Sequence, residues 1–344
     1  MKGFKRLVRW GILLLLAAVV VTGVRYVYRT FYAYDYDDTL DESKLGIGEP
    51  VNPAPQGGEQ GTKTAQEIIN IALFGVDARH GENSRSDAIM IVSIDGARGK
   101  IKLSSIMRDS YVDVKDYGMT KICHAYAYGG PELAINTINR NFDLDIREYA
   151  TVNFQDLAKI VDVIGGVEID VQKNEVKELN RVIREYAQEN GLKAKTIQEA
   201  GMQTLNGMQA LSYARVRKGT TGGDVARMGR QQELMSAIFD KVSGMNPVQY
   251  PGLVSELMPL VTTSLSSKEV LDVGMSAIKS GMPKIERASF PCEGDWTGKT
   301  VQGGMWVAAY SDEVAIEKMH AFIYDDIAPD AEKTDSSGNT SAEA

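Results

Sequence analysis

The sequence contains little cysteine, little histidine and no excess of positive charge. Among its 344 residues are two cysteines and three histidines, and 46 acidic side chains outnumber 38 basic ones, for a formal net charge of −8. The two cysteines have neither CxxC nor metal-ligand spacing, which argues against a zinc ribbon or a dithiol redox motif. A general nucleic-acid binder is normally basic over its binding domain, so this balance argues against that class. Any anion site must therefore come from a local cluster of bases.

Two further absences narrow the class of protein. The sequence has no GxSxG nucleophile elbow, which argues against a Ser-His-Asp hydrolase of that type, and it has no visible internal repeat. What is present is ordinary for a globular protein with a hydrophobic core: 43% hydrophobic and 24% charged residues. The length fits one or two domains.

The longest apolar run lies near the N-terminus. It covers residues 10–24, follows four basic residues, and is shorter than the ~20 residues that cross a bilayer core. Snorkelling of Arg25 and the aromatic segment 26–28 would extend it to the outer interface. We therefore expect residues 10–28 to form an uncleaved transmembrane signal-anchor, with residues 1–9 as a cytoplasmic basic flank. A cleaved signal peptide is the alternative, and both place the rest of the chain outside the cell membrane.

The remaining chain divides by composition into three parts. Residues 29–65 are rich in Gly, Pro and polar side chains in their second half, as in an extracytoplasmic spacer. Residues 66–327 carry the apolar periodicity of a folded domain. Residues 328–344, APDAEKTDSSGNTSAEA, have too few apolar side chains for a core and predict a disordered tail.

Strand-like and helix-like runs alternate along the folded domain. This alternation predicts an α/β fold, with a three-layer α/β/α arrangement around a central mixed sheet. The segment GARGK reads as a hairpin turn, and after residue 242 we expect helices and only one further strand. The predicted strands are 68–76, 87–95, 100–107, 149–154, 165–171 and 286–291, and the predicted helices are 131–142, 156–164, 175–191, 206–215 and 224–242.

Paired carboxylates stand at the ends of the first two predicted strands. Asp77 closes the first strand and Asp87 opens the second. Two such carboxylates can share one hard cation such as Mg²⁺, which takes oxygen ligands and keeps phosphate oxygens or waters in its other positions. Arg79 and Arg85 flank the same loop, and ion pairs between these arginines and the two acids are the alternative. Spacing alone favours the ion pairs.

Basic side chains cluster in YARVRKGTTGGDVARMGRQQ, residues 213–232. The segment holds four arginines and a lysine but one acid. In an extended course Arg215 and Arg217 would project to the same side, since side chains alternate along a strand. The TTGG sequence that follows predicts a flexible turn.

The second half of this segment predicts a helix with an anion-binding start. Asp224 is placed to cap the helix, and Arg227 and Gln231 lie one turn apart on one face. Arg230 would join them or point outward. Arginine forks, an amide and a helix N-terminus are the groups that suit phosphate oxygens.

Two more basic residues follow the third predicted strand. Arg108 directly follows the last residue of this strand and stands beside Asp109. Lys121 precedes a predicted loop that ends at Gly129 and Gly130. Each charge alone is ordinary for a protein surface. Their accumulation near predicted strand ends is what indicates a site.

These segments together resemble the LytR-CpsA-Psr family of cell-envelope enzymes. The resemblance covers residues 70–242 in order and lies in LFGVDAR, RSDAIMIVSID, SIMRDSYVDV, KICHAYAYGG, VNFQDLAKIVDVIGGVEIDV, LNGMQALSYARVR and DxxRxxRQ. It implies a Mg²⁺-dependent transferase that moves a glycopolymer from a polyprenyl-pyrophosphate carrier to peptidoglycan. Met107 and Cys123 depart from the family's usual Pro and Asn, and the second departure changes the wall beside Lys121.

The resemblance also implies roles for individual residues. Asp77 and Asp87 would hold the metal, and Asp224 would orient the arginines or the acceptor. A sugar hydroxyl of peptidoglycan would attack the sugar-linked phosphorus and polyprenyl phosphate would leave. The residues implied around the pyrophosphate are Arg85, Arg108, Lys121, Arg215, Arg217, Arg227 and Gln231, with Arg108, Arg217 and Asp224 as the catalytic set.

Several alternatives stay open at this point. Water as the acceptor would make the protein a hydrolase of the same lipid pyrophosphate, and a non-catalytic envelope regulator is a third possibility. Neither the pairing of Cys123 with Cys292 nor a general base follows from the sequence, although His80 and His124 fall in segments near the site. Apolar helix residues would line a lipid tunnel or fill an ordinary core: Leu133, Ile135, Leu157, Ile160 and Val161.

Overall fold

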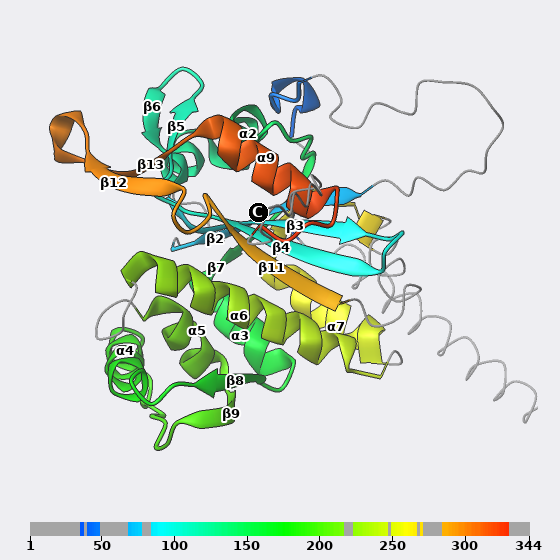
Figure 1. Ribbon diagram of the computed structural model, residues 1–344. Coiled ribbons are helices and arrows are strands. Elements are labelled where there is room, and N and C mark those ends of the chain that lie inside the picture. The colour runs from blue at the N-terminus through cyan, green and yellow to red at the C-terminus, as the bar shows by residue number, and fades with distance from the viewer. Residues whose placement is uncertain are drawn as a thin grey trace, which may run out of the picture.

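A seven-stranded mixed sheet forms the centre of the protein in the computed structural model (Figure 1). The structure describes residues 35–37, 40–48, 68–77, 84–216, 223–246, 249–266, 269–270 and 284–329. The strand order β1-β10-β7-β2-β3-β4-β11 combines antiparallel pairs, such as β2 with β3, and parallel pairs, such as β2 with β7. The α/β fold with a central mixed sheet is confirmed. The sheet strands are β1 (Asp35–Tyr36), β2 (Ile69–Val76), β3 (Ser86–Asp95), β4 (Lys100–Ile106), β7 (Glu148–Asn153), β10 (Thr262–Thr263) and β11 (Lys284–Phe290).

Helices cover both faces of this sheet (Figure 1). On one face α2 and α9 pack over a core that includes Phe74, Ile91 and Phe142. On the other face lie α3, α5, α6 and α7, with α4 beyond them, over cores that include Leu103 and Val161. The continuous apolar runs of β2 and β3 follow from this cover, because a strand buried on both faces has no solvent side. The helices are α2 (Ile122–Phe142), α3 (Phe154–Val163), α4 (Val176–Glu189), α5 (Gly207–Arg215), α6 (Gly223–Ser243), α7 (Tyr250–Leu257) and α9 (Asp312–Ile323).

Three two-stranded antiparallel sheets stand outside the central sheet. Two are hairpins, β5–β6 and β12–β13, whereas α4 lies between β8 and β9. The sequence pattern indicates β8 but not β9, and it misses both hairpins, because these strands are only four or five residues long. The expectation of one strand after residue 242 is therefore wrong. The strands of these sheets are β5 (Tyr111–Val114), β6 (Gly118–Lys121), β8 (Val167–Val171), β9 (Gly201–Leu205), β12 (Trp296–Thr300) and β13 (Trp306–Tyr310), and the single-turn helices are η1 (Glu42–Lys44), η3 (Met258–Leu260) and η4 (Gln302–Gly304).

The segment after Lys121 is helical, which corrects the predicted loop. Helix α2 begins at Ile122 and is interrupted at Gly129 and Gly130, where Gly130 has φ 64°. The Gly-Gly-Pro sequence suggested a loop, but the chain breaks the helical geometry for only these two residues and resumes it at Pro131, which tolerates the first turn of a helix.

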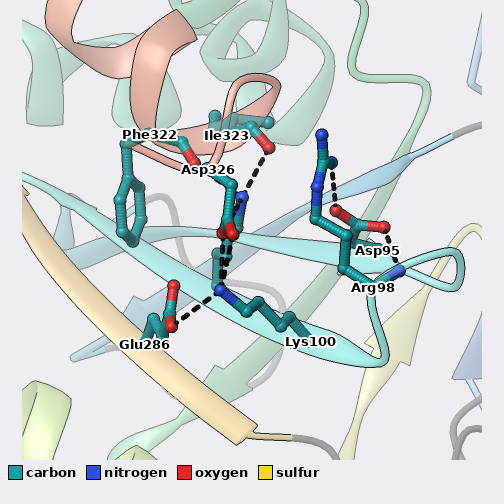
Figure 2. A network of polar contacts seen from close by, with 8 residues as sticks. Asp95, Arg98, Lys100, Glu286, Phe322, Ile323 and Asp326 are labelled. Atoms are coloured by element: carbon teal, nitrogen blue, oxygen red, sulfur yellow. Dashed lines mark hydrogen bonds and ion pairs between the residues drawn. The ribbon is translucent and has the colours of Figure 1, made fainter. Parts of the chain in front are cut away.

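A network of lysines and acids joins β4 and the edge strand β11 to the C-terminal end of α9 (Figure 2). Lys102 on β4 is fully buried, and its Nζ donates to the Phe322 and Ile323 carbonyl oxygens at 2.8 and 3.0 Å. Its charge lies 3.1 Å from Asp326, which also accepts from Lys100. The network thus supplies donors to carbonyl groups at the C-terminal end of α9, which otherwise have no intrahelical partner.

The predicted anchor, most of the spacer and most of the tail lie outside the described residues. Within the part that the structure describes, no helix is long and apolar enough to cross a membrane.

Candidate active site

A cleft of about 750 Å³ opens beside the central sheet, at the side where several of its strands begin or end. The end of β2, the start of β3 and the end of β4 meet at this side, since β3 runs antiparallel to both neighbours. The parallel pairing of β7 with β2 brings the start of α3 to the same place. Seven of the predicted site residues line the cleft: Asp77, Arg85, Asp87, Arg108, Arg215, Arg227 and Gln231.

Local sequence signals fix the helices around the cleft. Asn153 caps α3 by accepting from the Asp156 amide at 2.8 Å, and this places Phe154 at the cleft wall. Asn206 and Gln209 form a capping box at the start of α5. Gly207 lets α5 approach α3, because a Cβ at this position would collide with the Ala158 carbonyl. These contacts set the position of α5, whose last residue is Arg215.

Asp77 and Asp87 each have an arginine beside them, and two further carboxylates, Glu185 and Glu189 of α4, also line the cleft. Arg108 forms an ion pair and a hydrogen bond with Asp87, and both side chains are about one-fifth exposed. The Arg215 guanidinium lies 4.0 Å from Asp77, whose side chain is 58% exposed. The sequence suggested ion pairs with Arg79 or Arg85 as the alternative to a metal. Arg79 lies outside the described residues, and the ion pair that the structure shows for Asp87 is with Arg108, which follows β4.

Lys121 reaches the cleft indirectly. Its Nζ lies 2.6 Å from Asp109 Oδ1, and Asp109 Oδ2 lies 3.6 Å from Arg108 Nε. Lys121 is not among the residues that line the cleft. The buried Asp109 therefore links Lys121 to Arg108, a positioning role that the sequence did not assign, although the adjacent Arg-Asp pair was the available signal.

Helix α6 presents Arg227 and Gln231 to the cleft, with 2% and 9% exposure. Their spacing of one turn places them on one face, as the sequence predicted. Arg230 neither joins Arg227 and Gln231 at the cleft nor points outward, the two directions that the sequence allows. It is buried, its Nε donates to Glu175 at 2.7 Å, and its NH1 donates to the Val216 carbonyl at 3.2 Å. Arg230 thus joins α6 to the start of α4.

The extended course expected for Arg215 and Arg217 is wrong at its first residue. Arg215 is the last residue of α5, and its guanidinium lies 5.7 Å from the centre of the Phe154 ring. Arg217 and His80 lie outside the described residues. Helix α6 begins at Gly223, so Asp224 is its second residue and not the residue before the helix.

His124 and Cys123 lie at the start of α2, and burial shifts the pKa of both side chains. Burial lowers the pKa of His124, and the nearby charges of Arg85 and Lys121 lower it further, so the imidazole is neutral at pH 7. Burial raises the pKa of Cys123 to about 12, which keeps the thiol protonated. Cys123 and Cys292 are buried thiols that are not joined by a disulfide.

The predicted tunnel residues belong to two separate cores. Leu133 and Ile135 pack on the α9 side of the sheet, whereas Leu157 and Val161 pack against α5 and β8 on the other side. They therefore do not line one tunnel. The apolar lining of the cleft comes mainly from α3 and α4, through Phe154, Val182 and Tyr186, with Ala127 from α2.

The cleft suits an oxygen-binding cation with an anionic ligand. Asp77 and Asp87 offer carboxylate oxygens, and among the described residues no group of three or more His, Cys, Asp or Glu side chains gathers as a metal cage. Mg²⁺ is typically bound by one or two carboxylates together with phosphate oxygens and waters, so the donor set fits it. Soft-metal and zinc sites would need a different set.

The comparison with known families decides what kind of protein carries this cleft. The LytR-CpsA-Psr family model matches residues 32–317. The chain belongs to the LytR-CpsA-Psr family. Over 314 residues it is 27% identical to Oceanobacillus iheyensis TagU, named a polyisoprenyl-teichoic acid–peptidoglycan teichoic acid transferase, with 88% of each chain covered. Over 231 residues it is 31% identical to Staphylococcus aureus MsrR, named a regulatory protein, with 66% of each chain covered.

The fold also matches solved structures of the LytR-CpsA-Psr family. The structure of Bacillus subtilis YwtF (TagT) with bound octaprenyl pyrophosphate lipid aligns with a TM-score of 0.55 at 23% identity, covering 78% of this chain and 93% of TagT. At this level of identity the likeness is one of fold.

Proposed function

We propose that this protein transfers a glycopolymer from a polyprenyl-pyrophosphate carrier to a hydroxyl group of peptidoglycan. The observation that carries the proposal is the convergence of Arg85, Arg108, Arg215 and Arg227 on a cleft that also holds the carboxylates of Asp77 and Asp87 on its sheet side and those of Glu185 and Glu189 on α4. A pyrophosphate suits such a cleft because its oxygens accept from several planar guanidinium groups. The names of the TagU relative and of the lipid-bound TagT structure support the same substrate class.

The arginines would act by holding and neutralising the pyrophosphate. The acceptor oxygen forms a bond to the sugar-linked phosphorus while the bond from that phosphorus to the oxygen of the departing polyprenyl phosphate breaks. Such a displacement depends on in-line positioning and on charge stabilisation more than on covalent chemistry by the protein. Arg108 lies beside Asp87 and Arg215 lies beside Asp77, and Arg227 of α6 is buried at the cleft. Because Lys121 and Asp109 fix the Arg108 side chain, its guanidinium needs little reorganisation.

Asp77 and Asp87 are the residues that would hold Mg²⁺. When bound, Mg²⁺ would neutralise charge on the pyrophosphate oxygens. We further propose that residues 10–28 anchor the protein in the membrane with the cleft outside the cell, which places it where lipid-linked glycans and peptidoglycan meet.

The test is whether polyprenyl phosphate release depends on the acceptor. Purified protein, a polyprenyl-pyrophosphate-linked oligosaccharide and Mg²⁺ are incubated with and without peptidoglycan fragments. We expect release to be at least about tenfold faster with peptidoglycan and to stop in excess EDTA. Equal release in both mixtures would assign a hydrolase.

Two variants separate the metal from the arginines in this assay. Asp77→Asn and Asp87→Asn remove carboxylates but keep the shape of the side chain, so we expect higher Mg²⁺ concentrations to restore part of the rate. Full activity of the double variant without added Mg²⁺ would contradict the proposed metal site. Absence of any turnover by the wild type would favour a regulator, as the name of MsrR suggests for that relative.

A further inference from the structure

Exposed aromatic rings form a row beside the cleft. Tyr117, in the turn between β5 and β6, stacks on Tyr128 of α2 with ring centroids 4.3 Å apart and an angle of 17°. The His124 ring lies 5.8 Å from Tyr128 on the same helix. Tyr117 and Tyr128 are 55% and 43% exposed, so these rings are not part of a core. We call Tyr117, Tyr128 and His124 the aromatic row.

The β12–β13 hairpin adds further exposed apolar surface nearby. Trp306 is 41% exposed and packs edge-on against Trp296 with centroids 6.3 Å apart. Gly298 on β12 leaves room for this indole, because a Cβ there would come within 2.8 Å of it. Four of the nine exposed large apolar side chains among the described residues lie on these neighbouring elements: Tyr117, Met119, Tyr128 and Trp306.

Specific contacts join the hairpin, the aromatic row and the cleft. The Thr120 hydroxyl lies 2.9 Å from His124 Nδ1 and 3.9 Å from the Met305 sulfur. The Ala308 amide donates to the Asp109 carbonyl at 2.9 Å, and Asp109 in turn contacts Arg108 in the cleft. In Figure 1, β5, β6, β12 and β13 lie above the central sheet and α4 lies below it, all toward the left of the view. Tyr128 follows Ala127, which lines the cleft, so the aromatic row begins next to one wall of the cleft.

The opposite wall of the cleft is mixed in character. Phe154, Val182 and Tyr186 of α3 and α4 supply apolar side chains there, and Arg181, Glu185 and Glu189 of α4 line the same wall. In the proposed transferase the first units of the polyprenyl chain would lie against the three apolar side chains. In an in-line displacement the attacking oxygen approaches the phosphorus from the side opposite the leaving oxygen. If polyprenyl phosphate leaves along α3 and α4, the acceptor approaches from the side of the aromatic row.

We propose that the aromatic row and the exposed face of Trp306 bind the acceptor glycan strand of peptidoglycan. This inference rests on the proposed transferase function. Aromatic faces carry partial negative charge, and the C–H groups of a pyranose ring stack on them while the sugar hydroxyls stay in water. A contiguous exposed apolar patch rimmed by polar groups marks an interaction site. The exposed bases Lys115 and Lys299 lie on the same hairpins and suit the carboxylates of the stem peptides.

The binding test uses purified, undecorated peptidoglycan glycan strands and the full-length protein. We expect the double variant Tyr117→Ala/Tyr128→Ala to bind the strands about tenfold more weakly by isothermal titration calorimetry, since two stacking surfaces are lost. Tyr117→Phe/Tyr128→Phe keeps both rings and should bind within about twofold of wild type. Leu192→Ala, at a side chain of similar exposure (53%) beyond the end of α4, is the matched control and should bind as wild type does. Equal binding by the alanine and phenylalanine variants would overturn the inference.

The transfer assay adds a second readout. The alanine variant should raise the KM for peptidoglycan about tenfold, with kcat and the affinity for the lipid-linked donor near wild type. Because the binding arm needs no turnover, a wild type that binds strands through these tyrosines but transfers nothing would contradict the proposed function and not the glycan surface. Loss of vesicle binding or of self-association in the alanine variant, with strand binding intact, would assign the surface to a membrane or to a second copy and overturn the inference.

Discussion

Replacing Arg108 with alanine is expected to lower the rate of glycopolymer transfer by roughly 10³-fold. Arginines that stabilise charge on a transferred phosphoryl group contribute 10³–10⁵ in rate in other enzymes. Arg108 stands at the end of β4, pairs with Asp87 and is held by Asp109. Alanine would remove the positive charge beside Asp87 and leave that carboxylate facing a dianionic substrate. The measurement is kcat for transfer at saturating donor and peptidoglycan.

Two further variants show whether the lower transfer rate comes from the missing guanidinium group of Arg108. Arg108→Lys keeps the charge but not the planar fork, so it should recover part of the rate. Arg98→Ala removes a half-exposed arginine that pairs with Asp95 at the opposite end of β3, and it should leave transfer unchanged. A thermal unfolding curve for each variant separates loss of chemistry from loss of fold. Wild-type transfer by a folded Arg108→Ala protein would remove Arg108 from the mechanism.

The second large effect concerns stability and involves Lys102. We expect Lys102→Met to lower the free energy of unfolding by about 3 kcal/mol. The substitution removes two donors from buried carbonyl groups at the end of α9 and leaves Asp326 without one of its two lysine partners. Removing one partner of a buried charged contact costs more than an exposed ion pair is worth, because the other groups stay desolvated. Urea unfolding of the purified protein, followed by circular dichroism, measures the difference.

Lys100→Met is the matched control, because Lys100 contacts Asp326 and Glu286 but is 22% exposed. It should lower the free energy of unfolding much less than Lys102→Met does. The pKa of Asp326 is held below its ordinary value mainly by the hydrogen bond from Lys100, and Lys102 adds to this. The stabilisation through Asp326 is therefore fully present above the ordinary carboxyl pKa and is lost as the pH falls through the lowered value. The Lys102→Met difference should shrink as the pH falls through the lowered pKa of Asp326 and persist in part, since the carbonyl contacts do not depend on that carboxyl group. Equal effects of the two variants at pH 7 would contradict this account.

Much of the central sheet is predictable from the sequence because its inner strands are covered on both faces. β2, β3 and β4 appear as apolar runs with bounds within a residue of those observed. Strands that are largely exposed show no continuous apolar run in the sequence. An example is β12, with the polar, largely exposed sequence WTGKT. The strong turn signals of Gly129 and Gly130 predict a loop before them. This segment is instead the start of α2, and three of its residues are buried in a core: Ile122, Cys123 and Ala125. Tertiary packing overrides the local preference there.

The composition of the cleft was predictable for a topological reason. The neighbouring strands β2, β3 and β4 alternate in direction, so the end of β2, the start of β3 and the end of β4 lie together. Asp77, Asp87 and Arg108 stand at these strand ends, and their proximity follows from the strand order. Side-chain direction did not follow from spacing. Arg230 is one residue from Gln231, yet it turns into a buried pair with Glu175, a residue distant in sequence. Such contacts depend on how α4 packs on α6, and no local pattern encodes that packing.

The most direct test of the central claim follows one phosphorus atom. The donor carries ³²P in the sugar-linked phosphate of its pyrophosphate, and it is incubated with the protein, Mg²⁺ and unlabelled peptidoglycan. The proposed transfer predicts that the label moves into peptidoglycan with the glycan and that nuclease-free muramidase digestion releases it on a sugar–phosphate–sugar conjugate. Label that appears only in a soluble sugar phosphate, or that stays with the lipid after prolonged incubation, would contradict the account.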